Sequence, residues 1–120
     1  MGWSIVFYQR RSGEEPVRDF LLTLPIKHRA KAIWEIDLLA EHGTMLNEPY
    51  AKAIVGERYA GLWELRIQYA SDISRIFYFM YEGNRFVLLH GFLKKTDRTP
   101  TRELEQAIKY RMDYLRRVDS

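Results

Sequence analysis

The stretch that decides the fold is residues 87–96, which read Val87-Leu88-Leu89-His90-Gly91-Phe92-Leu93-Lys94-Lys95-Thr96. It opens as an apolar run of strand length and ends in two adjacent lysines. The polar loop Asp97-Arg98-Thr99 follows, and then Pro100, which favours a helix start because its missing N–H costs nothing in a first helical turn. A buried strand that carries two lysines to its end holds positive charge at a fixed place, which predicts a phosphate site.

Two further strands are predicted just before this stretch. The earlier one alternates between apolar and polar residues, so Glu64, Arg66 and Gln68 share its polar face. The next carries large side chains on both faces, which is typical of a central strand. Short turns join all three strands into an antiparallel meander. The strands and turns are, in order, residues 62–69, 70–72, 73–81, 82–84 and 85–93.

The longest helical pattern of the first half covers residues 26–42, and Gly43 is placed to stop it. Trp34 is expected in the stripe of this helix that faces the sheet. His28 and His42 lie on the same helix and are expected at the surface.

The remaining elements complete an α+β domain. Residues 3–8 are rich in aromatic and β-branched side chains and predict a first strand, and Pro16 begins a short helix that forms a hairpin with the next one. A closing helix is expected over residues 100–118, with Thr99 as its N-cap. The predicted order is β-α-α-β-β-β-α in a single domain, residues 1–120, with helices packed on one sheet. The closing helix has an apolar stripe that we expect to face the core, formed by Leu104, Ala107, Ile108, Met112 and Leu115.

Composition narrows the class of protein. Of the 120 residues, 47% are hydrophobic, which is enough for a packed core. No apolar run is long enough to span a bilayer, and the N-terminus lacks the pattern of a signal peptide. The chain has no cysteine and three histidines, so we expect no structural metal site, no cofactor and a reducing, cytoplasmic environment.

The charge is concentrated in the last third of the chain. The formal net charge is +3, of which residues 1–84 contribute −1 and residues 85–120 contribute +4. A local basic surface favours phosphate or an acidic partner, although charges spread over a solvated face give the same count.

Arg66 and Arg75 lie on consecutive predicted strands, and a two-residue turn at Ala70-Ser71 makes them cross-strand neighbours. Two guanidinium groups side by side predict an anion between them, unless each pairs with a carboxylate such as Glu64. Lys94 and Lys95 point to opposite faces, so one of them joins the polar face. Cleavage of RNA by its own 2′-hydroxyl requires stabilisation of a charged phosphate, which fixed arginine and lysine side chains supply. The predicted catalytic residues are therefore Arg66, Arg75, Lys94 and Lys95.

Proton transfer is harder to assign. A lysine acts as an acid or base when neighbouring cations lower its pKa. His90 is the conventional acid–base residue, but its place in an apolar strand favours a core histidine with its own partner. Predicted RNA contacts are Phe92, Thr96, Arg98 and Tyr110, the aromatic members by stacking on bases, with core packing as the competing role of Phe92.

The segments 62–66, 74–79 and 88–96, followed by Thr99-Pro100 and a helix with Glu103 and Ala107, resemble the phage-derived HigB branch of the RelE/ParE toxin superfamily. The resemblance covers nearly the whole chain in order. It implies a small twisted, mainly antiparallel sheet with helices on one face. It also implies catalytic roles for Arg66, Arg75 and Lys94 or Lys95.

The function implied by the resemblance is that of a type II toxin, a cytoplasmic endoribonuclease that cuts mRNA on the translating ribosome. Its implied partner is a helix-turn-helix antitoxin of the HigA kind. Two alternatives remain: a ParE-like toxin that inhibits an essential protein such as DNA gyrase, and an inactive module that only binds an antitoxin.

Overall fold

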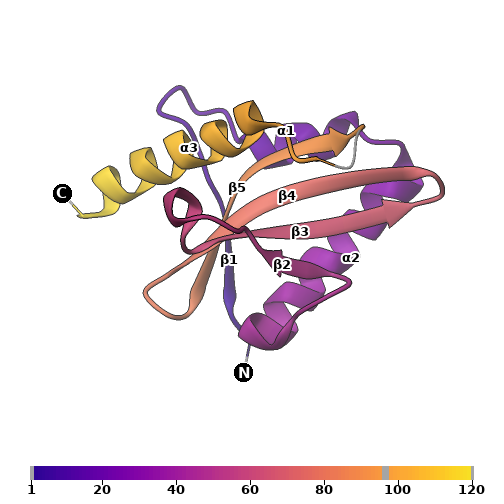
Figure 1. The fold of residues 1–120 in the computed structure, drawn as a ribbon, viewed down its shortest axis with the longest axis horizontal. Helices are drawn as coiled ribbons and strands as arrows, with labels where there is room; N and C mark the ends of the chain where they lie inside the picture. The colour runs from indigo at the N-terminus through magenta and orange to yellow at the C-terminus, as the bar shows by residue number, and fades with distance from the viewer. Residues whose placement is uncertain (1, 96–97, 120) are drawn as a thin grey trace.

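A five-stranded mixed sheet forms the centre of the fold (Figure 1). The computed structural model describes residues 2–95 and 98–119. The strand order is β1-β5-β4-β3-β2, in which β1 runs parallel to β5 and every other pair is antiparallel. The elements are, in chain order, β1 (Ser4–Phe7), α1 (Pro16–Thr23), α2 (Ile26–His42), η1 (Gly43–Met45), β2 (Ala51–Ala53), η2 (Glu57–Tyr59), β3 (Leu62–Tyr69), β4 (Asp72–Tyr81), β5 (Arg85–Lys94) and α3 (Thr101–Asp119).

The α+β class and the predicted element order are confirmed, with a short additional pairing at β2. Tyr69 pairs with Asp72, so Ala70 and Ser71 form the two-residue turn that the sequence predicts. The strand β5 contains a bulge, because Phe77 faces His90 while the next residue of β4, Tyr78, faces Leu88. Leu89 is therefore the extra residue of β5.

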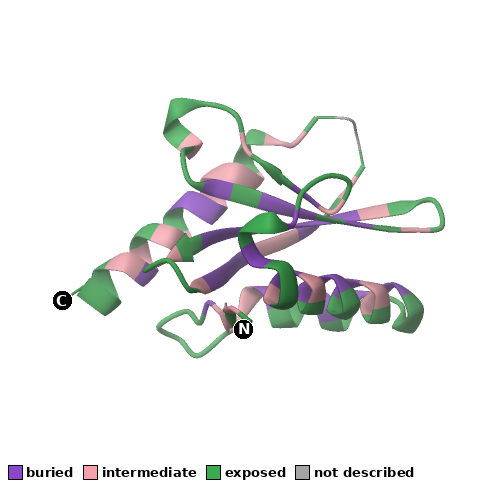
Figure 2. Cartoon of the chain, turned by 90° about the horizontal axis from the view of Figure 1, so that it is seen from below, coloured by how far each residue is buried: buried purple, intermediate pink, exposed green. Residues whose placement is uncertain are grey.

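Helices cover both faces of the sheet, which differs from the single covered face implied by the resemblance. On one face α1 and α2 pack against Leu65, Ile67, Ile76 and Leu88. On the other face α3 packs through Ala107 and Ile108 over residues of β3, β4 and β5. Figure 2 shows α1 and α2 as a layer beneath the strands. The strands are buried on both sides because large side chains alternate between two separate cores.

The prediction for the faces of α2 is wrong. Trp34 is 47% exposed, whereas His28, expected at the surface, is 1% exposed. The helix carries two apolar stripes at helical spacing, and the sheet buries the one formed by Ala32, Ile36 and Leu39. His28 is accommodated in the core because its Nε2 lies 3.0 Å from the Ser74 hydroxyl, with which it shares a hydrogen bond.

The start of α3 and its buried face also differ in detail from the prediction. The helix begins at Thr101, and the Pro100 carbonyl accepts the first helical N–H bonds from Glu103 and Leu104. Pro100, rather than Thr99, is therefore the capping residue. Met112 is 48% exposed, because the buried stripe of α3 runs through Tyr114 instead.

Candidate functional site

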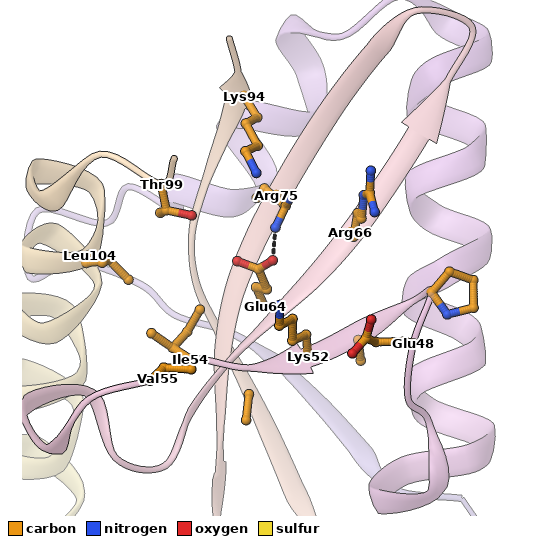
Figure 3. A pocket seen from close by; sticks show the side chains of 13 residues that line it. Glu48, Lys52, Ile54, Val55, Glu64, Arg66, Arg75, Lys94, Thr99 and Leu104 are labelled. Carbon is orange, nitrogen blue, oxygen red and sulfur yellow. Dashed lines mark ion pairs between the residues drawn. The ribbon is translucent and has the colours of Figure 1, made fainter. Parts of the chain in front are cut away.

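A cleft of about 540 Å³ opens on the face of the sheet that α3 also covers. Its floor is formed by β3 and β4, its walls by the end of β5, the start of α3 and the segment around β2 (Figure 3). The three predicted cations Arg66, Arg75 and Lys94 all line it. The remaining lining residues are Glu48, Pro49, Ala51, Lys52, Ala53, Ile54, Val55, Glu64, Thr99 and Leu104.

Arg66 and Arg75 are direct cross-strand partners, as the turn at Ala70-Ser71 predicts. They differ in environment. Arg75 is 7% exposed and forms an ion pair with the equally buried Glu64, whereas Arg66 is exposed and forms no ion pair with the described residues. Burial lowers the pKa of Arg75, but an arginine stays protonated at neutral pH. The cleft thus has one cation fixed in its floor and one that reaches into solvent.

Only the first lysine of the pair reaches the cleft. Lys94 is half-buried at the end of β5, and in Figure 3 its side chain points toward Arg75. Lys95 is exposed and does not line the cleft. The alternation of side chains along a strand explains the difference, because Phe92 and Lys94 lie two residues apart on one face.

The predicted RNA contacts lie in different places. Phe92 is 7% exposed and its ring packs 5.4 Å from that of Phe77, so core packing occupies it. Tyr110 stacks on Tyr8 with their ring centroids 4.8 Å apart, on the far side of α3 from the cleft. Arg98 is exposed beside the start of α3, and Thr96 lies outside the described residues.

His90 does not face the cleft. Its Nε2 lies 2.6 Å from a Glu103 carboxylate oxygen, and its ring lies between those of Phe92 and Tyr110. His90 is therefore a half-buried histidine with its own partner, as its place in an apolar strand predicts, and it is not positioned to act in the cleft.

Several cleft residues were not predicted. Glu64 was expected only as a possible partner of the arginines, yet it belongs to the cleft and lies opposite Lys52 of β2. The sequence could have indicated the place of Glu64 in the cleft, because the alternation of β3 puts Glu64 and Arg66 on one face. Glu48 lies in the connection before β2 and Lys52 lies on the three-residue strand β2, which is too short to show a periodic pattern in the sequence.

The described residues contain no group of three histidine, cysteine or acidic side chains that could hold a metal ion. Within the same residues, no helix is long and apolar enough to cross a membrane.

The element order and the sheet are those of a RelE-like fold. The chain belongs to the family described as phage-derived protein Gp49-like, whose model matches residues 19–112. This family lies in the RelE toxin-like group, and the match includes Arg66, Arg75 and Lys94. No curated protein is significantly similar to the chain.

Proposed function

We propose that this chain is the toxin of a type II toxin–antitoxin pair and that it cleaves mRNA without a metal ion. The observation that carries the proposal is the convergence of Arg66, Arg75 and Lys94 on one open cleft. Cations fixed before the substrate arrives stabilise a phosphate whose charge increases in the transition state, and they do so without reorganisation.

In the proposed reaction, the 2′-oxygen of one nucleotide loses its proton and attacks the adjacent phosphorus. The bond from phosphorus to the 5′-oxygen of the next nucleotide breaks, and that oxygen takes up a proton. The products are a 2′,3′-cyclic phosphate and a free 5′-hydroxyl, so no water is consumed in this step.

The residues of the cleft divide these tasks. Arg66 and Lys94 contact the phosphate, and Glu64 positions Arg75 beneath it through their ion pair. Glu48 is the carboxylate that can accept the proton of the 2′-hydroxyl, because it lines the cleft, is exposed, and has no ion pair among the described residues. Lys95 and Arg98 are exposed shortly after the end of β5 and extend the basic surface toward the RNA chain.

The proposed partners follow from the same function. A helix-turn-helix antitoxin of the HigA kind neutralises the toxin, and the translating ribosome presents the mRNA. A small helix-turn-helix gene adjacent to this one would support the toxin class, although not the nuclease activity.

The test is induction of the chain in bacteria without its partner, followed by mapping of transcript ends. Arg66→Gln and Lys94→Gln should each lower cleavage at least about 100-fold, the usual effect of removing one transition-state contact. Arg18→Gln is the matched control, because Arg18 is exposed on α1, away from the cleft residues.

Growth arrest with intact transcripts would contradict the proposal. Accompanying DNA damage would point to a ParE-like toxin, and harmless expression together with tight antitoxin binding would point to an inactive module. Equal cleavage by Arg66→Gln and Arg18→Gln would also refute the assignment of the cleft.

A further inference from the structure

A second, smaller cavity of about 150 Å³ adjoins the cleft. It lies between α2 and the outer edge of β3, at the point where β2 no longer covers that edge. The pairing of β2 extends only from Ala51 opposite Leu65 to Ala53 opposite Trp63, and beyond it the Arg66 N–H donates to the Tyr50 carbonyl. The lining residues are Lys31, Glu35, Pro49, Tyr50, Arg66 and Gln68.

The two cavities share Arg66 and Pro49. In Figure 3 the Arg66 side chain stands between the cleft and α2. A nucleotide whose phosphate is held by Arg66 in the cleft therefore has this cavity beside it. Its volume of about 150 Å³ is several times what one water molecule needs, which leaves room for the edge of one flat base.

The cavity contains an unusual polar group. Glu35 is 1% exposed, and one of its carboxylate oxygens, Oε2, lies 3.4 Å from the Lys31 ammonium. The other oxygen, Oε1, is buried and has no hydrogen-bond partner among the described residues. Leaving a buried acceptor unpaired is unfavourable, so the site is suited to a ligand that brings N–H donors.

Lys31 adds a donor beside this acceptor. Its ammonium donates to the Gln68 carbonyl at 2.7 Å and lies beside Glu35, which leaves one of its three N–H groups for a ligand. The wall of the cavity thus contains a buried carboxylate next to an ammonium. Among the RNA bases, guanine matches this pair best, because its Watson–Crick edge carries two N–H donors beside a carbonyl oxygen.

We propose that this cavity binds a guanine base next to the scissile phosphate, with Glu35 accepting from its N–H groups and Lys31 donating to its carbonyl oxygen. The inference rests on the proposed RNA cleavage and adds the substrate preference of that site. Glu35 is a specificity-determining residue in this scheme and takes no part in the chemical step.

The first experiment maps cleavage sites across the bacterial transcriptome for the wild type and for Glu35→Gln. Wild-type sites should be enriched in guanine at one fixed position relative to the cut. Glu35→Gln keeps the side-chain volume but replaces one of the two carboxylate oxygens by an NH2 donor. The preference for guanine should therefore fall about tenfold or more, while cleavage at sites without guanine persists. Glu41→Gln, an exposed change on the same helix, should leave the preference unchanged.

The second experiment does not depend on cleavage. Wild-type protein is titrated with the 5′-monophosphates of guanosine, adenosine, cytidine and uridine, and the amide NMR signals of residues 31–35 are followed. Guanosine monophosphate should bind at least about tenfold more tightly than the other three and should shift these signals.

The outcomes separate the two proposals. Cleavage with an unchanged guanine preference in Glu35→Gln overturns the base site but leaves the nuclease. Absence of cleavage together with selective guanosine monophosphate binding overturns the nuclease but leaves the base site. Cleavage without any fixed base preference, or nucleotide binding without selectivity, overturns the base site directly.

Discussion

Glu35→Gln should stabilise the protein at alkaline pH. Burial raises the pKa of the Glu35 carboxyl from its ordinary value of 4.5 to about 7, and the nearby Lys31 only partly opposes this shift. A displacement of this size corresponds to about 3 kcal/mol of free energy of unfolding. Above pH 7 the wild type carries the whole cost of the buried charge, and a neutral glutamine of the same size removes it.

The sign of the pH dependence follows from proton binding. Between pH 4.5 and 7 the folded state of the wild type binds the proton that the unfolded state has released, so this group makes stability fall as pH rises. The gain from Glu35→Gln should therefore be about 3 kcal/mol at pH 8 and under about 1 kcal/mol at pH 5.

Urea unfolding at both pH values measures this difference. With a slope of about 2 kcal/mol per molar urea, the midpoint at pH 8 should rise by about 1.5 M. Glu41→Gln serves as the control, because Glu41 is exposed on the same helix and should change the midpoint little. Equal midpoints for wild type and Glu35→Gln at pH 8, or an equal gain at both pH values, would refute the reasoning.

Two further predictions concern packing and the buried ion pair. Gly91→Ala should destabilise the fold by about 1–3 kcal/mol in thermal unfolding, because the new Cβ would lie 2.5 Å from Cδ2 of Phe20; adding Phe20→Leu should recover part of the loss. Glu64→Ala should lower the free energy of unfolding by about 3–5 kcal/mol, because it leaves Arg75 buried without its partner. The double variant Glu64→Leu with Arg75→Met should return the urea midpoint close to that of the wild type, but it should not restore cleavage.

The meander was predictable because its signals are local. Alternation in residues 62–69 and the two-residue turn at Ala70-Ser71 determine which residues of β3 and β4 face each other. The pairing of Arg66 with Arg75 follows from that register alone. The ion pair of Arg75 with Glu64 could not be predicted in the same way. It depends on how deeply these two side chains are buried in the cleft floor, and their burial depends on which parts of the sheet α3 and β2 cover.

The buried face of α2 was not predictable from hydropathy. Ile26, Ile33 and Trp34 are more apolar than His28 and Glu35, yet they face solvent while the two polar residues face the sheet. The helix has apolar residues on two sides, so the choice depends on tertiary contacts such as that of His28 with Ser74. Glu48 reaches the cleft from an irregular connection and Lys52 from the three-residue strand β2, and neither segment is marked by a periodic pattern.

The parallel pairing of β1 with β5 has a consequence for the order of synthesis. Ser4 is translated well before its partner, Arg85, and the walls of the cleft close only with residues beyond Lys94. A nascent chain of this topology cannot complete its sheet until most of its length has left the ribosomal exit tunnel, because distant contacts form last. The complete sheet and the cleft therefore form late, after β5 and the start of α3 have emerged, whereas local elements such as α2 and the hairpin of β3 with β4 can form earlier.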